Sequence, residues 1–258
     1  MHSIVGETAR AVAFLSRIKV PDRYFAGSNG MIIDSVRAFP IAGVVVAAPA
    51  AAVFFLLLFL SVSPLFAAVF AVSVLVLTTG ALHEDGLADT ADGFWGGRDR
   101  EHILKIMKDS SIGAYGSLAL ILIVVLRVSG LSAIAASAGA VSSALALLAV
   151  AVLSRTAMVW HWHVLPAARP DGVAVSAGRP DGDAMVFAGL SGAAVSGLLA
   201  YAAGGLAGIA SMFLLVAVVC AGFSRIANGK IGGHTGDTIG ASQLVCEIAA
   251  LLGLVLWI

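Results

Sequence analysis

Long apolar runs alternate with polar segments along almost the whole chain after residue 37. Seven of the runs are close to membrane-spanning length, about 20 residues. None of them alternates every second residue, as the strands of an outer-membrane barrel would. The pattern therefore predicts an all-α, polytopic integral membrane bundle of about seven transmembrane helices, with approximate bounds 38–60, 64–82, 112–130, 132–153, 184–203, 205–223 and 238–257.

The composition supports a membrane protein. Apolar residues make up 60% of the chain and charged residues only 12%, whereas about a quarter of the residues in a typical soluble domain are charged. The two cysteines, Cys220 and Cys246, both fall inside apolar runs, which favours neither a disulfide framework nor a zinc site. The formal net charge is zero and no basic cluster stands out. The lipid bilayer is therefore an expected partner, and nucleic acid is not.

The polar connections predict the orientation of the chain. Those after the first, third and fifth runs are very short and uncharged, whereas three long connections, 83–111, 154–183 and 224–237, carry most of the charge outside the N-terminal segment 1–37. By the positive-inside rule, segment 1–37 and these three loops face the cytoplasm. We therefore treat residues 1–258 as a single multi-pass domain of the cytoplasmic (inner) membrane, with a cytoplasmic or interfacial N-terminal segment.

The stretch HEDGLADTADG at residues 83–93 holds four carboxylates. On a helix, Asp85, Asp89 and Asp92 would lie within roughly 60° of one another, while Glu84 would point about 100° away. Like charges at this spacing destabilise a helix, and a helix C-terminus disfavours negative charge. A bound cation would offset both costs, and carboxylates alone suit a hard cation such as Mg²⁺. The sequence therefore predicts a Mg²⁺ site, with a solvated polar helix end as the alternative.

Basic residues follow the acidic stretch within a few turns. Arg98, Lys105 and Lys108 all come before residue 110. Carboxylates that hold Mg²⁺ and nearby cations that hold phosphate are the parts of a phosphoryl-transfer site. Arg155, at the end of the fourth run, is another candidate phosphate contact, although each of these bases alone could equally serve only to set topology. Asp109 is either part of this group or the N-cap of the next span.

The last loop, NGKIGGHTGDTIGAS at residues 228–242, is rich in glycine and could wrap a phosphate on backbone N–H groups. His234 would add a donor to that site. Asp237 is either the N-cap of the last span or a further metal ligand. Glu247 lies about 15 Å farther along the same helix. A carboxylate in an apolar span favours a functional site, unless it is protonated and hydrogen-bonded.

Two other polar features have structural interpretations. Arg127 lies near the outer end of the third run, and we interpret it as snorkelling to the far membrane interface. His161 and His163 stand two residues apart beside two tryptophans. On a helix they would diverge, so we expect interfacial residues rather than a metal pair.

The ordered set of motifs resembles the cobalamin synthase family, whose members are adenosylcobinamide-GDP ribazoletransferases. The long match is TGALHEDGLADTADGFWGGRDREHILKIMKDSSIGAYG at residues 79–116, and GDTIGA at 236–241 is a second motif. RAFPIAG at 37–43 and LSRTAMVW at 153–160 are weaker signatures. Ser111 stands where a basic residue is common in the family, and the position of Glu84 varies, which weakens the case for Glu84 as an essential ligand.

The resemblance implies an Mg²⁺-dependent integral membrane enzyme whose three long loops form the active site. In the family's reaction the ribose 3′-hydroxyl of α-ribazole, or of its 5′-phosphate, attacks the cobinamide-side phosphorus of adenosylcobinamide-GDP, and GMP leaves. We therefore expect a catalytic, metal-binding set and a set of phosphate contacts. The first comprises Asp85, Asp89, Asp92 and Asp237, with Glu84 as an additional metal candidate; the second comprises Arg98, Lys105, Lys108, Arg155 and His234.

Two other classes of function remain as alternatives. A CDP-alcohol phosphotransferase also holds metal on membrane-helix aspartates, but its Asp-Gly motif continues to an arginine where this chain has Asp89. A cation or metabolite transporter would place its acids near the bilayer midplane, where only Glu247 clearly lies. The sequence leaves open the number of metal ions, the general base, and whether the protein forms a homo-oligomer or a complex with other cobalamin-assembly enzymes.

Overall fold

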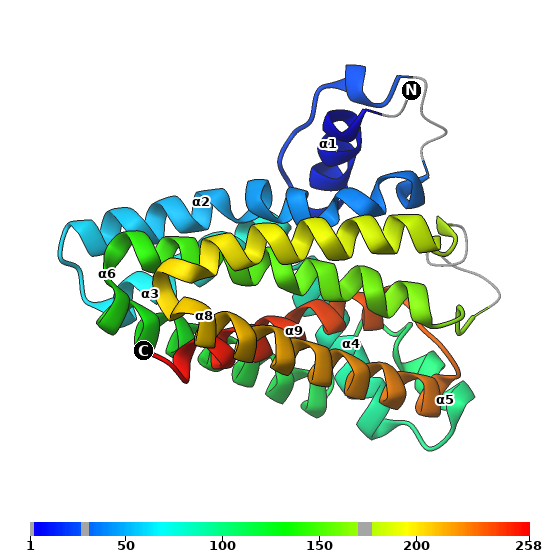
Figure 1. Ribbon diagram of the computed structural model, residues 1–258. Coiled ribbons are helices and arrows are strands. Elements are labelled where there is room, and N and C mark those ends of the chain that lie inside the picture. The colour runs from blue at the N-terminus through cyan, green and yellow to red at the C-terminus, as the bar shows by residue number, and fades with distance from the viewer. Residues whose placement is uncertain (1–2, 27–30, 170–176) are drawn as a thin grey trace.

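The computed structural model describes residues 3–26, 31–169 and 177–258, and every regular element in these ranges is a helix (Figure 1). The predicted all-α fold is therefore confirmed. The elements in chain order are α1 (Ile4–Leu15), the 3₁₀ turns η1 (Asp22–Tyr24) and η2 (Ile32–Ala38), α2 (Phe39–Phe59), α3 (Pro64–Thr79), α4 (Leu82–Gly96), α5 (Arg100–Ile106), α6 (Ala114–Val164), α8 (Gly182–Ile231) and α9 (Gly236–Val255).

Helices α6 and α8 are each a hairpin of two helical halves. Gly139 in α6 (φ 75°, ψ 172°) and Gly205 in α8 (φ 56°, ψ −161°) are non-helical, with a positive φ that glycine adopts readily. In α8, a Cβ built at Gly197 would lie 3.6 Å from the ring of Phe213, whereas a straight helix would separate these residues by about 24 Å. The chain therefore reverses at Gly205, and Figure 1 shows the same reversal in α6.

The membrane-spanning helices correspond to the seven predicted apolar runs. In the described chain four helices are long and apolar enough to cross a membrane: α2 together with η2, α6, α8 and α9. Helices α3 and α4 together make a fifth candidate, bent by 89° between them. Each predicted run then corresponds to one helical segment. The segments are α2, α3 as the apolar arm of the bent pair, the two halves of α6, the two halves of α8, and α9.

The predicted loops are more helical than expected. Residues 154–164 complete α6, residues 224–231 complete α8, and most of the predicted loop 83–111 forms α4 and α5. A span predicted from hydropathy ends at the first charged residues. In the structure the helix continues past that point, because charged side chains find partners inside the protein. Residues 170–176 of the predicted loop 154–183 lie outside the described part of the chain.

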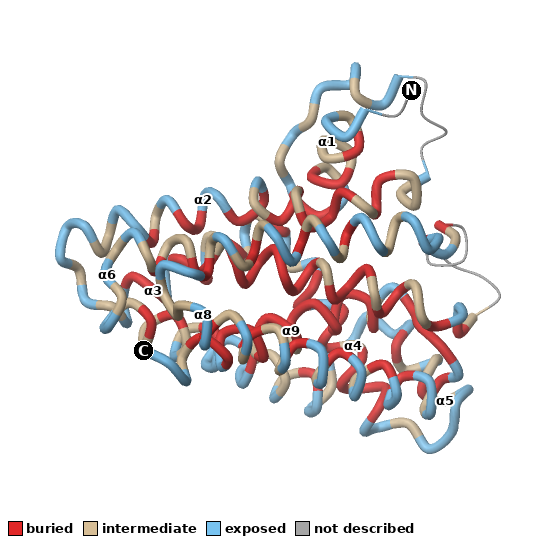
Figure 2. Tube along the Cα trace, viewed as in Figure 1, coloured by how far each residue is buried: buried red, intermediate tan, exposed pale blue. Residues whose placement is uncertain are grey.

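The two ends of the bundle differ in character (Figure 1). The chain reversals at Gly139 and Gly205 gather at the same end as the C-terminus, whereas α4, α5 and the connection from α8 to α9 lie at the opposite end. Helix α9 is the most buried of the candidate spans, and Figure 2 shows it surrounded by outer helices whose exposed sides alternate with buried ones. The exposed sides carry large apolar residues such as Leu77, Leu190 and Leu198, as expected for a lipid-facing surface.

The N-terminal segment packs onto the bundle through α1. Ala11, Val12 and Leu15 are buried in a cluster that also contains residues of η2 and α2. Glu7 is buried as well, and its carboxylate forms a bidentate ion pair with Arg37, at 2.6 Å and 2.7 Å. This pair holds α1 against η2 at the end of the bundle that carries α4 and the start of α9.

Candidate active site

Glycines bring α4 and the start of α9 into direct contact. A Cβ built at Gly86 would lie 2.7 Å from the backbone oxygen of Asp237, and one at Gly240 would lie 3.5 Å from the Cα of His83. Thr235 caps α9, because its hydroxyl accepts a hydrogen bond from the backbone N–H of Thr238 in a capping box. Asp237 is therefore in the first turn of α9 and is not its N-cap. Its carboxylate accepts one hydrogen bond from the hydroxyl of Thr235, at 3.2 Å.

The structure brings three of the predicted aspartates together at this contact. The pKa of Asp89 is raised to about 7, first by burial and then by the negative charges of Asp237, Asp85 and Asp92. A shift in this direction means that neighbouring carboxylates resist sharing the site as anions. Helix α4 lies toward the end of the bundle opposite the C-terminus (Figure 1), so these carboxylates gather at that end. A cation between these side chains would relieve their mutual repulsion.

The donor set fits Mg²⁺ in its chemistry, because it supplies only carboxylate oxygens. Within the described residues, however, no group of three or more His, Cys, Asp or Glu side chains surrounds a common point as a metal shell would. Asp85 is exposed and Asp89 and Asp237 are half-buried, so their side chains have room to turn toward a shared ion. These three residues are the ones that would hold it.

Asp92 is held by α6. The backbone N–H groups of Gly113 and Gly116 donate to its two carboxylate oxygens, at 2.7 Å and 2.9 Å. A Cβ at either glycine would lie within 2.5 Å of those oxygens, so the contact requires glycine. Carboxylates are favoured at a helix N-terminus by its unpaired N–H groups and dipole. Asp92 thus fixes the start of α6 against α4. The sequence prediction, which placed Asp92 on the same helical face as Asp85 and Asp89, did not indicate this role.

The N-cap interpretation of Asp109 is wrong. Its carboxylate accepts hydrogen bonds from the backbone and hydroxyl of Ser111, and these bonds lower its pKa. Helix α6 begins later, with Gly113 in the N-cap position.

We predict that Asp92→Asn lowers the stability of the protein by about 1–3 kcal/mol. The amide keeps one acceptor oxygen, but its NH₂ group faces a backbone N–H and leaves that donor unpaired. Thermal unfolding in detergent measures the effect. Asp99→Asn is the matched control, because Asp99 caps α5 by accepting one hydrogen bond from the His102 backbone, and asparagine caps about equally well. Equal melting temperatures for the two variants would contradict the role given to Asp92.

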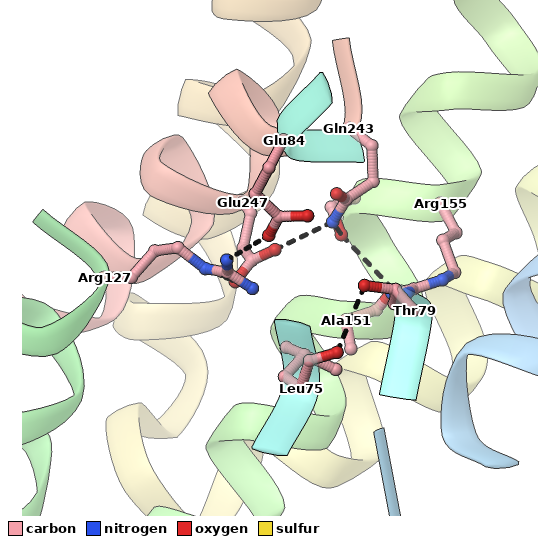
Figure 3. A network of polar contacts seen from close by, with 9 residues as sticks. Leu75, Thr79, Glu84, Arg127, Ala151, Arg155, Gln243 and Glu247 are labelled. Carbon is pink, nitrogen blue, oxygen red and sulfur yellow. Dashed lines mark hydrogen bonds and ion pairs between the residues drawn. The ribbon is translucent and has the colours of Figure 1, made fainter. Parts of the chain in front are cut away.

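Glu84 lies in a buried ion-pair network (Figure 3). Arg127 donates to Glu84 at 2.7 Å and to Glu247 at 2.8 Å. The amide nitrogen of Gln243 donates to Glu247 at 2.8 Å and to the hydroxyl of Ser154 at 2.9 Å. This arrangement removes the reason for counting Glu84 among the metal ligands. It also accounts for Glu247, which sequence reasoning left open, as an ion-pair partner.

The interpretation of Arg127 as a snorkelling residue is wrong. Its side chain is 2% exposed and lies between α4 and α9, pointing toward Glu84 and Glu247 in Figure 3. A buried charge persists when it is paired, and Arg127 has two carboxylates. Its partners are distant in sequence, so the chain's hydropathy gave no sign of them.

Arg155 and His161 are also internal. Arg155 is buried beside the same network, and its guanidinium donates to the backbone oxygen of Ala151. It is not displayed as an open phosphate contact. The interfacial interpretation of His161 is wrong, because this side chain is fully buried and lies 2.7 Å from the hydroxyl of Ser224. His163 bonds the backbone oxygen of Pro180.

The basic residues divide into exposed and structurally engaged ones. Three are exposed: Arg98 before α5, Lys105 within it and Lys108 just after it. Arg169, which sequence reasoning did not single out, is the cation whose charge lowers the pKa of Asp89. Its guanidinium donates to the backbone oxygen of Leu104, and its Nε is buried with no hydrogen-bond partner among the described residues. In the sequence, the feature that marks the position of this residue is the Arg-Pro-Asp-Gly stretch that begins at Arg169.

His234 helps to place Arg169. Its backbone forms a short β-bridge with the segment before Arg169, through hydrogen bonds of 2.8 Å to Pro166 and from Ala168. Burial, and secondarily the charge of Arg179, lowers the pKa of His234 to about 4. The side chain is therefore neutral at pH 7 and offers a hydrogen bond to a ligand, not a positive charge.

Comparison with known proteins assigns the family. Residues 7–255 match the family model described as cobalamin-5-phosphate synthase. The chain belongs to this family. The resemblance found in the sequence motifs is thereby confirmed, and it extends over almost the whole chain.

Three relatives illustrate the match, and each is named adenosylcobinamide-GDP ribazoletransferase. The relative from Rhizobium meliloti (strain 1021) is 53% identical over 97% of this chain and 96% of its own length. The one from Rhizobium johnstonii is 50% identical, covering 96% and 95%. The one from Brucella anthropi is 41% identical, covering 99% and 98%. No solved structure matches the chain.

Proposed function

We propose that this protein is an integral membrane adenosylcobinamide-GDP ribazoletransferase. It joins adenosylcobinamide-GDP to α-ribazole or α-ribazole 5′-phosphate and releases GMP, a late step in assembling the nucleotide loop of cobalamin. The observation that carries the proposal is the crowded set of carboxylates where α4 meets α9, in a chain that belongs to the cobalamin-5-phosphate synthase family.

The reaction moves one phosphoryl group. The oxygen of the ribose hydroxyl forms a bond to the cobinamide-side phosphorus and gives up its proton to a base. The bond from that phosphorus to the bridging oxygen breaks, and GMP leaves with that oxygen. Negative charge grows on the bridging oxygen as the bond breaks, and stabilising it accelerates the transfer. Bound Mg²⁺ would supply that stabilisation by neutralising pyrophosphate oxygens.

The chain's own residues divide the work. Asp85, Asp89 and Asp237 would hold the ion, while Asp92 fixes α4 against the start of α6. Arg169, beside the aspartates, is positioned to contact a phosphate oxygen through its unpaired Nε. The exposed cations Arg98, Lys105 and Lys108 follow α4 along the chain, where they would attract an anionic substrate.

We place the site on the cytoplasmic side of the inner membrane. The basic residues of the three long connections support this orientation by the positive-inside rule. Nucleotide-linked substrates would reach the site from that side, while the apolar surfaces of α3, α6 and α8 face lipid.

We predict that removal of divalent cations abolishes turnover. The purified protein in detergent should release GMP from adenosylcobinamide-GDP and α-ribazole when Mg²⁺ is present, and excess EDTA should lower the rate to background. Adding Mg²⁺ beyond the EDTA should restore it, because the aspartates again have a cation to share. An unchanged rate in EDTA would refute the metal's role, and no GMP release under any condition would refute the proposed function.

A further inference from the structure

His83 is a buried histidine whose two ring nitrogens have no hydrogen-bond partner in the described part of the chain. Its side chain is 3% exposed, and neither Nδ1 nor Nε2 forms a hydrogen bond with any residue in the described ranges 3–26, 31–169 and 177–258. Buried polar groups in proteins are almost always hydrogen-bonded, so one that is not calls for a partner outside the protein chain, such as a water, an ion or a ligand. His83 has no role in the proposed phosphoryl transfer.

His83 lines a cavity of about 280 Å³ beside the aspartates. Asp85 and Asp237 line the same cavity, so it opens onto the phosphoryl-transfer site. The remaining walls are mainly apolar and come from α1, η2, α6 and α9. They include Phe14, Leu15, Ile32, Met158, Trp162 and Ile239.

The cavity offers few polar groups to a ligand. The indole N–H of Trp162 already donates to the backbone oxygen of Gly178, at 3.0 Å, so the ring presents apolar surface. Among the lining residues that the structure describes, none is a lysine or an arginine. The interior therefore suits a flat apolar group that needs one hydrogen bond, with further polar atoms directed toward Asp85 and Asp237.

The two substrates of the proposed reaction differ in how well their chemical groups fit this apolar cavity. The pyrophosphate of adenosylcobinamide-GDP needs cations, and its corrin ring is too large for the cavity. Its guanine carries several donors and acceptors that apolar walls would leave unpaired, at a high cost in affinity. The base of α-ribazole is a dimethylated bicyclic aromatic ring with one free imine nitrogen and no N–H donor.

We propose that this cavity is the subsite for the base of α-ribazole and that His83 donates a hydrogen bond to the free imine nitrogen of the base. The inference rests on the proposed function. A neutral imidazole has one N–H to donate, and Phe14 and Trp162 supply aromatic surface for the ring. The ribose then extends toward Asp85 and Asp237, where its hydroxyl would attack. His83 is thus a specificity-determining residue for the acceptor.

The test compares α-ribazole with an analogue in which a C–H group replaces the imine nitrogen, the α-riboside of 5,6-dimethylindole. With the wild-type enzyme, GMP release should show a KM for the analogue about tenfold higher than for α-ribazole, the loss expected for one buried hydrogen bond. His83→Phe should raise the KM for α-ribazole about tenfold and should no longer distinguish the two acceptors. The KM for adenosylcobinamide-GDP should stay unchanged.

A second variant keeps the proposal testable if His83→Phe does not fold. Ile239→Trp fills the cavity from α9 and should raise the KM for both acceptors equally. Ala217→Trp is its matched control, because Ala217 lines a different apolar cavity between α6 and α8 and should leave every KM unchanged. Size-exclusion chromatography in detergent establishes that each variant is folded.

Binding without turnover separates the two hypotheses. Equilibrium dialysis of α-ribazole against the full-length protein, without adenosylcobinamide-GDP, should show binding that weakens about tenfold in His83→Phe. If His83→Phe binds α-ribazole as tightly as wild type, still distinguishes the two acceptors, or instead raises the KM for adenosylcobinamide-GDP, the subsite is wrong. If wild type binds α-ribazole in this way but releases no GMP, the subsite stands and the proposed reaction fails.

Discussion

Asp89→Asn is expected to lower Mg²⁺-dependent GMP release by about 10²–10³-fold. Asp89 stands where the charges of Asp85, Asp92 and Asp237 converge, so its oxygens are central to any ion that the site holds. Asparagine keeps the size and one acceptor oxygen but removes the negative charge that binds the cation. Initial rates at saturating substrates, with and without Mg²⁺, measure the effect.

The matched control is Asp183→Asn, which makes the same chemical change at an exposed position in the first turn of α8. It should retain the wild-type rate. Near wild-type turnover by Asp89→Asn, or equal losses in both variants, would rule out the central role of Asp89.

The same variant has a second readout in the stability of the metal-free protein. The folded-state pKa of Asp89, about 7, lies above its unfolded value of about 3.9. The contribution of the protonated carboxyl to stability is therefore fully present below pH 4 and is lost as the pH rises through 7. In EDTA the melting temperature of wild type should fall between pH 5 and pH 8 more than that of Asp89→Asn, and Mg²⁺ should raise it again at pH 8. Parallel pH profiles for the two proteins would show that the carboxylates are not crowded.

Arg127→Met is expected to destabilise the protein by about 3–5 kcal/mol, because it leaves Glu84 and Glu247 buried without their cation. Arg127 joins the two helices that carry the aspartates, through 2.7 Å and 2.8 Å ion pairs. Its loss should therefore also lower activity by releasing α4 from α9. Thermal unfolding in detergent and GMP release by the folded fraction measure the two effects separately.

The triple variant Arg127→Met, Glu84→Gln, Glu247→Gln should recover much of the stability, since a neutral group of similar size costs far less to bury than an unpaired charge. Arg225→Met, at an exposed position near the end of α8, is the matched control and should change the melting temperature little. Recovery would show that the network acts as a balanced charge set. If the triple variant were as unstable as Arg127→Met, charge imbalance would not be the cause.

Properties that depend on local sequence were predictable. The seven apolar runs and the all-α class follow from hydropathy and length, which each segment carries by itself. The shared face of Asp85 and Asp89 follows from the helical period of α4. The motifs at residues 79–116 and 236–241 were enough to predict the family.

The partners of charged side chains were not predictable, because they depend on which helices pack together. Arg127 is 43 residues from Glu84 and 120 from Glu247. Its position near the outer end of an apolar run suggested instead that its side chain reaches the membrane interface. Asp92 looked equivalent to Asp85 and Asp89 until the start of α6 was placed against it. His161 looked interfacial until Ser224 and Thr238 were placed around it.

The sequence by itself therefore determined the membrane bundle, the family and the acidic stretch HEDGLADTADG, since each depends only on residues that are close together in the chain. Only the tertiary structure decided how that stretch is used: Asp85 and Asp89 face Asp237, Asp92 holds α6, Glu84 pairs with Arg127, and His83 lines a cavity. Neighbouring residues on one helix point in different directions, and each side chain's role depends on the helix that it meets.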